Sequence, residues 1–125
     1  MNLSTTRVIG NVLETTWGKS SSPDGTYSVK YALAGDRLTL KYTTVVHFAG
    51  ERALGPQVDA AHNQAIQLVD AKLGEVKDAY KAVSGSSLKL EDLGGKDDLE
   101  LIQSTAGSDR KIAYYRYNHV FQIED

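Results

Sequence analysis

A long segment covering residues 56–83 carries apolar side chains at the spacing of one helical face. Polar residues such as Asp59, Gln67 and Lys77 lie away from that face. The apolar stripe consists of Val58, His62, Ala65, Ile66, Val69, Leu73, Val76, Tyr80 and Val83. The pattern predicts one long helix that covers another layer with a single face and ends at Gly85, a residue suited to a helix C-terminus.

The chain before this helix predicts three strands. Residues 3–17 are rich in Thr, Val, Ile and Leu, which favours a strand with a bulge or bend at Gly10. Residues 19–25 have turn composition. Residues 27–33 and 38–48 alternate apolar with polar positions, and only a short Gly-containing segment separates them, so they predict a hairpin.

The chain after the helix predicts three more strands, at residues 87–91, 99–104 and 110–123, with a Gly-Gly-Lys-Asp-Asp loop between the first two. Together these elements predict an α+β fold. Its sheet is expected to be an antiparallel sheet or flattened barrel of about six strands, with the long amphipathic helix inserted between two three-strand halves. All 125 residues are expected to form a single domain.

The composition limits which cellular compartments and which classes of partner we expect for this chain. The chain has no cysteine, which excludes disulfides, thiolate nucleophiles and Cys-ligated zinc. With 14 basic and 16 acidic residues and no long run of like charge, it is not expected to bind nucleic acid. No apolar segment is long enough for a membrane span, and no export signal is visible. We expect a cytoplasmic protein, or a virion protein if it is viral.

No motif names a reaction, so no catalytic, cofactor-binding or metal-binding residue is predicted, and an enzyme is not expected. The spacing of His47, His62 and His119 does not suggest a metal site. Residues 50–55 have the outer glycines of a P-loop, but Pro56 and Gln57 stand where Lys and Ser or Thr are required, so this segment is interpreted as a connector.

The acidic residues around the Gly-Gly loop could hold calcium or provide paired carboxylates for catalysis. They lack the spacing of an EF-hand, so a solvated hairpin tip is the favoured interpretation. The cluster consists of Glu91, Asp92, Asp97, Asp98 and Glu100.

In the last predicted strand, Tyr114 and Arg116 face away from the stripe of Tyr115, Tyr117, His119 and Phe121. Tyr and Arg are enriched at protein interfaces. With the outward-facing Val45 they are interface candidates, and the alternative is that Tyr114 and Arg116 make cross-strand pairs that stabilise the sheet. The leading hypothesis is therefore a non-catalytic structural or assembly protein that forms a homo-oligomer or docks into a larger complex. One concrete version is a phage tail-completion, connector or decoration protein.

The alternative hypothesis is a small-molecule-binding protein or compact enzyme. Its pocket would lie between helix and sheet, near His62, Tyr80, Tyr115 and His119. A cavity of about 300 Å³ or more lined by these side chains would favour this alternative, whereas a filled core with a flat apolar patch would favour assembly.

Overall fold

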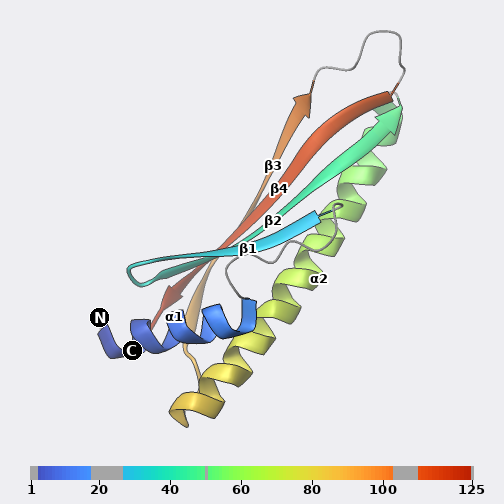
Figure 1. Ribbon diagram of the computed structural model, residues 1–125. Helices are drawn as coiled ribbons and strands as arrows, with labels where there is room; N and C mark the ends of the chain where they lie inside the picture. The colour runs from blue at the N-terminus through green and yellow to red at the C-terminus, as the bar shows by residue number, and fades with distance from the viewer. Residues whose placement is uncertain (1–2, 18–26, 50, 103–109, 125) are drawn as a thin grey trace.

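The computed structural model describes residues 3–17, 27–49, 51–102 and 110–124. The four strands form one antiparallel sheet in the order β1-β2-β4-β3. The elements in chain order are α1 Leu3–Trp17, β1 Tyr27–Ala34, β2 Arg37–Ala49, α2 Glu51–Ser84, β3 Leu90–Ile102 and β4 Arg110–Ile123 (Figure 1). The predicted α+β fold, with one long helix between strands, is confirmed. The prediction of about six strands is wrong, because the described chain forms four.

The helix α2 buries Ala65, Val69 and Val76 of the predicted stripe, together with Ala61, which is not part of it. The stripe ends before Val83, whose exposed fraction is 69%. Gly85 follows the helix with a positive φ of 78°, and its N–H donates to the Lys81 carbonyl at 2.8 Å, as expected for a helix C-terminus.

The predicted start of this helix is wrong, because α2 runs from Glu51 to Ser84. The predicted connector at residues 50–55 is therefore helical from Glu51 onward, while residue 50 lies outside the described residues. Pro56 falls in the second turn, where its missing N–H leaves one carbonyl of the preceding turn without a helical donor. Helical continuation on both sides, driven by burial of the stripe, outweighs this local cost.

The segment Leu3–Trp17 is a helix, and the predicted strand with a bulge at Gly10 is wrong. Ile9, Val12 and Leu13 are buried at helical spacing, against α2 and β1. At Gly10 a Cβ atom would come 3.7 Å from a Leu33 methyl carbon, so the helix packs closely on β1 there. Burial of this short apolar stripe outweighs the strand preference of its β-branched residues.

The predicted hairpin of β1 and β2 is confirmed, with Leu33 opposite Leu38 and Gly35 in the turn at a φ of 62°. The inward positions of β2, which include Leu38, Leu40 and Tyr42, are buried as the alternation predicted. The predicted turn at residues 19–25 lies outside the described residues.

The predicted strands at residues 87–91 and 99–104 are wrong, because β3 is one strand from Leu90 to Ile102 that pairs with β4. Residues 103 and 104 lie outside the described residues. The register shifts between Asp92 and Gly94, and Gly94 has a φ of 99°. The chain therefore makes a β-bulge at Leu93 and Gly94 inside a strand, and Gly95 continues the regular pairing, so the two glycines do not form a loop. The acidic cluster lies along this strand, and its interpretation as a hairpin tip is wrong.

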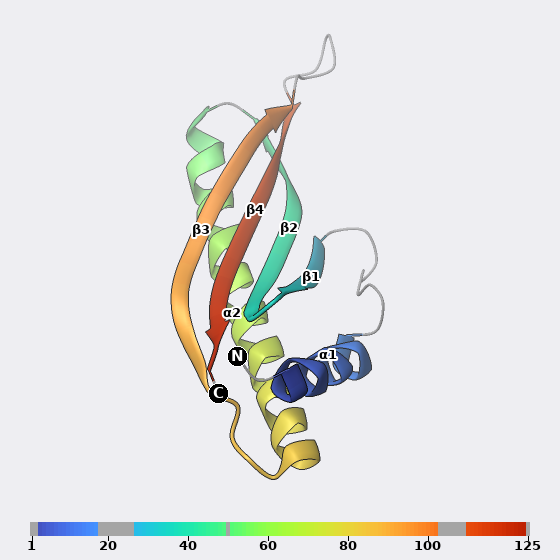
Figure 2. The same ribbon diagram turned by 90° about the vertical axis from the view of Figure 1, so that its left-hand side faces the viewer.

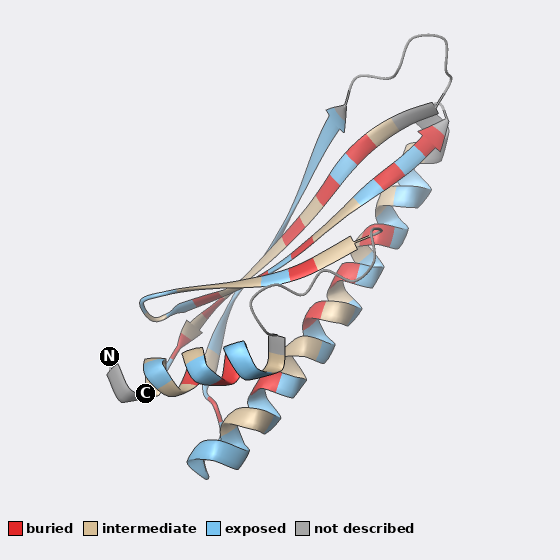
Figure 3. Ribbon diagram, in the orientation of Figure 1, coloured by how far each residue is buried: buried red, intermediate tan, exposed pale blue. Residues whose placement is uncertain are grey.

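Both helices lie on one side of the sheet, where α2 runs along β2, and no described helix covers the other side (Figure 2). The buried side chains lie between α2 and the inner face of β2 and β4 (Figure 3). We call the uncovered side the outer face. Neither described helix combines the length and apolar composition needed to cross a bilayer.

Candidate functional site

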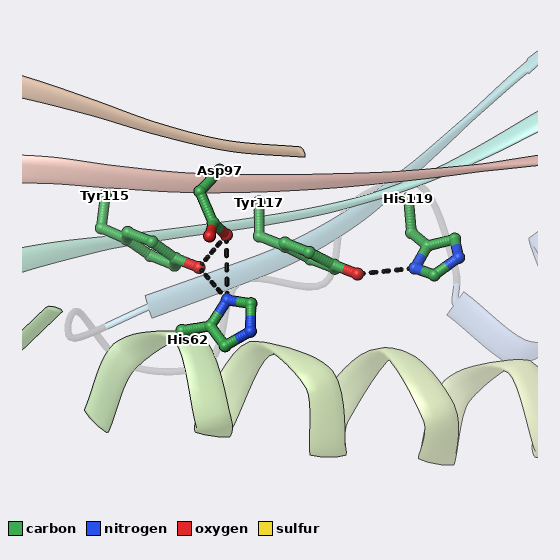
Figure 4. Close-up of polar contacts among 5 residues, drawn as sticks. All are labelled: His62, Asp97, Tyr115, Tyr117 and His119. Carbon is green, nitrogen blue, oxygen red and sulfur yellow. Dashed lines mark hydrogen bonds and ion pairs between the residues drawn. The ribbon is translucent and has the colours of Figure 1, made fainter. Parts of the chain in front are cut away.

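A line of polar side chains lies where α2 and β3 approach each other over β4. Its members come from α2, β3 and the inner face of β4, so the fold brings together residues far apart in sequence (Figure 4). We call this line the polar row, and it consists of His62, Asp92, Asp97, Tyr115, Tyr117 and His119.

At one end of the polar row, His62, Asp97 and Tyr115 contact one another. The Tyr115 hydroxyl donates to Asp97 Oδ1 at 2.5 Å, and His62 Nδ1 lies 3.0 Å from the same oxygen and 3.2 Å from the Tyr115 hydroxyl. An ionised carboxylate only accepts hydrogen bonds, so His62 Nδ1 carries the proton of its hydrogen bond with Asp97. This hydrogen bond ties the edge strand β3 to α2.

At the other end, His119 has both ring nitrogens occupied. Its Nε2 lies 2.6 Å from Asp92 Oδ1, and its Nδ1 lies 2.6 Å from the Tyr117 hydroxyl. A neutral His119 therefore donates from Nε2 to Asp92 and accepts the Tyr117 proton at Nδ1. The His119 ring also stacks on Phe121, with centroids 4.5 Å apart. Every polar position of this histidine is thus occupied within the fold.

The tyrosines and Asp92 have shifted pKa values. Burial raises the pKa of Tyr115, and the neighbouring Asp97 carboxylate raises it further. Burial also raises the pKa of Tyr117, with smaller contributions from Asp97 and Asp92. The hydrogen bond from His119 lowers the pKa of Asp92, and the Gly94 N–H, which donates to it at 2.7 Å, lowers it further. The tyrosines therefore stay protonated and act as hydrogen-bond donors near neutral pH.

Within the polar row, His62 is the side chain best placed to take part in a reaction. Its Nδ1 is oriented by Asp97, and its Nε2 makes no hydrogen bond with any residue that the structure describes. A histidine held by a carboxylate at one nitrogen, with the other nitrogen free, has the arrangement of a general base. The His62 side chain is 41% exposed, so a small molecule could reach it from solvent.

Two hollows lie elsewhere. A cleft of about 500 Å³ opens between the end of β2 and the first half of α2, lined by Thr44, Val45, Val46, His47, Gln57, Ala60, Ala61 and Gln64. A smaller hollow of about 140 Å³ lies between α1 and α2. The four predicted pocket residues line neither of these two hollows.

The three predicted interface residues lie side by side on the outer face, and we call them the outer-face patch. Val45 is directly opposite Tyr114 in the register, and their exposed fractions are 37% and 38%. The Arg116 guanidinium lies 5.6 Å from the centre of the Tyr114 ring, and it pairs with Glu100 at 2.9 Å and Asp98 at 3.3 Å. The patch is therefore an ordered cross-strand surface with an apolar centre and a charged margin.

The structure brings together three of the four predicted pocket residues, because His62, Tyr115 and His119 all belong to the polar row. Tyr80 does not belong to it and packs, half-buried, against the core. Sequence reasoning missed Asp92, Asp97 and Tyr117 as members of the row. Asp97 falls in the predicted loop, although its alternation with Leu99 and Leu101 is a signal for a strand face. Asp92 reaches the same face only because the register shifts between Asp92 and Gly94. Among the described residues, no group of three or more histidine and acidic side chains is arranged for a metal ion.

Comparison with known proteins adds no relative. No protein-family model, no curated protein and no solved structure matches this chain.

Proposed function

We propose that the protein is a non-catalytic assembly component that forms a homo-oligomer or docks into a larger complex. The observation that carries this proposal is the outer face, which no described helix covers and which presents the contiguous outer-face patch. An uncovered sheet face with exposed Tyr, Val and Arg side chains is typical of an interaction surface.

The sheet edges add support. On β3 the side chains of Leu99 and Leu101 point to the inner side but remain 38% and 64% exposed, because α2 lies mainly along β2 and covers little of the outermost strand apart from the contact of His62 with Asp97. An edge strand with exposed apolar side chains gains stability when another chain covers it. One concrete form of this proposal is a phage tail-completion, connector or decoration protein, located in the virion; a cellular protein of this kind would be cytoplasmic.

Light scattering over a concentration series tests self-association. We expect a mass above that of the 13.6 kDa monomer at tens of micromolar in physiological salt. Arg116→Ala should fold normally and associate more weakly, because it loses its contact with Tyr114 and leaves the two acidic side chains without their cation. Association that is unchanged in Arg116→Ala would show that the outer-face patch is not the contact.

A second candidate function, a small-molecule-binding protein or compact enzyme, is favoured by the free Nε2 of the oriented His62. An activated ester such as p-nitrophenyl acetate is a suitable probe for a histidine base or nucleophile. This candidate predicts that His62→Gln loses most of the hydrolysis rate, while His47→Gln, which removes an exposed histidine of β2, retains it. Equal rates for both variants would exclude a special role for His62.

A further inference from the structure

Three lysines lie in one line across the outer face. In the register of the sheet, Lys30 of β1 is directly opposite Lys41 of β2, Lys41 is opposite Asn118 of β4, and Asn118 is opposite Lys96 of β3. All three lysines are exposed, and none makes an ion pair with a described residue. We call Lys30, Lys41 and Lys96 the lysine row.

This arrangement is unfavourable for the isolated protein. Like charges directly opposite each other on neighbouring strands repel, and Lys30 and Lys41 occupy such a pair of positions. Asp98 and Glu100, two and four residues beyond Lys96 on the same face of β3, are already paired with Arg116. The lysine row therefore lacks a compensating anion within the described molecule.

Most side chains next to the lysine row are short. The adjacent register line on one side consists of Ala32, Thr39, Val120 and Gly94, and the line on the other side consists of Ser28, Thr43, Arg116 and Asp98. Apart from the paired Arg116 and Asp98, these residues are small, so the lysines extend beyond them. No helix or strand that the structure describes lies over this face (Figure 2).

The described outer face as a whole is basic, although the chain has a net charge of -2. Its basic side chains outnumber its acidic ones, with Lys30, Arg37, Lys41, Lys96 and Arg116 against Glu91, Asp98 and Glu100. The acidic side chains lie on β3, at one margin. Among the described residues, the positive charge of this face without an ion-pair partner therefore lies on the lysine row and on Arg37.

We propose that the lysine row docks a short acidic segment of a protein partner, laid across the strands beside the outer-face patch. This inference rests on the proposed assembly function and names the chemistry of the partner. Four strands spaced about 4.8 Å apart give the row a length of roughly 14 Å. An extended chain with carboxylates at alternate residues presents three of them over about the same distance. A phosphate backbone fits less well, because its charge would continue onto the acidic margin of β3.

A fluorescent peptide with the sequence Glu-Thr-Glu-Thr-Glu is the probe, and its anisotropy reports binding to the full chain. Weak binding that falls with added salt is expected. Lys41→Glu should weaken it at least about fivefold, since attraction of roughly half a kcal/mol becomes repulsion of similar size. Lys77→Glu makes the same charge change on the exposed side of α2 and should leave binding unchanged.

A melting curve separates loss of contact from loss of fold. Lys41→Glu replaces a repulsive cross-strand pair with an attractive one to Lys30, so its melting temperature should rise by about 1 to 3 °C. If Lys41→Glu is more stable than the wild type and binds the peptide less tightly, the lysine row serves docking and not the stability of the fold.

Three outcomes would overturn the proposal: no peptide binding at low salt, an equal loss in Lys77→Glu, or tighter binding of a single-stranded oligothymidine of equal charge. The last outcome would make the outer face a nucleic-acid surface. Failure here is distinguishable from failure of the assembly function, because light scattering on the same samples reports self-association independently of the peptide.

Discussion

At the scale of single residues, Gly95 determines whether the polar row can form. A Cβ atom at this position would overlap the Tyr117 ring and its hydroxyl, which lie across the glycine backbone. Tyr117 in turn donates to His119, which holds Asp92. The absence of one side chain on β3 therefore allows three others to meet, and the local sequence around a Gly-Gly pair does not reveal this.

Gly95→Ala should consequently lower the free energy of unfolding by about 1 to 3 kcal/mol, the usual cost of forcing a packed side chain aside. Urea denaturation measures this change. Gly74→Ala is the matched control, because Gly74 lies within α2 and a Cβ added there would meet no atom within 4 Å. This variant should be more stable than the wild type by up to about 1 kcal/mol. Equal stability of Gly95→Ala and the wild type would mean that Tyr117 does not lie across Gly95.

Asp92 makes the free energy of unfolding depend on pH in the acidic range. Its pKa in the folded protein lies below the ordinary value of 3.8, so its contribution is present above pH 3.8 and is lost as the pH falls through the folded-state pKa. We expect Asp92→Asn to be less stable than the wild type at neutral pH and the difference to disappear in strong acid. Urea denaturation at several pH values measures it, and Asp78→Asn, on the exposed side of α2, should show no such trend.

At the scale of elements, the alternating strands and the long helix follow from the sequence because each has one buried face. The apolar positions of β2 and β4 repeat every second residue, and those of α2 repeat with the helical period. The wrong assignments of α1 and β3 share a cause. In both, residue types that are common in another kind of structure were given more weight than the spacing of the apolar positions. In α1, β-branched residues suggested a strand although Ile9, Val12 and Leu13 have helical spacing. In β3, two glycines suggested a loop although the strand continues through them, with a bulge just before Gly94.

The buried stripe of α2 gives the sharpest test at this scale. Val69 is 1% exposed, so Val69→Asp places an unpaired carboxylate in the core and should unfold the protein or cost several kcal/mol. Val83→Asp makes the same change at a position that is 69% exposed and should cost less than about 1 kcal/mol, mainly through the helix dipole. Melting curves compare the two. If Val69→Asp were to melt like the wild type, the stripe would not be a core face.

At the scale of the whole molecule, the candidate site was only partly predictable. The periodicity placed His62 on the inner stripe of the helix and Tyr115 and His119 on the inner face of the last strand. His62 and Tyr115 do meet, and His119 belongs to the same row through its contact with Tyr117. Their aspartate partners come from β3, and no local pattern specifies which edge strand will lie beside α2. The positions of Val45, Tyr114 and Arg116 on one exposed face were predictable, because alternation fixes the face and the hairpins fix the register.

The central claim is that the outer face of the sheet is the surface through which this protein assembles. Light scattering of Val45→Asp beside Val83→Asp at tens of micromolar tests it most directly, because both variants add one carboxylate at an exposed valine, the first on the outer face and the second on α2. We predict an oligomer for the wild type and Val83→Asp, and a folded monomer for Val45→Asp. A wild type that is monomeric, or a Val45→Asp variant that associates as fully as Val83→Asp, would contradict the claim.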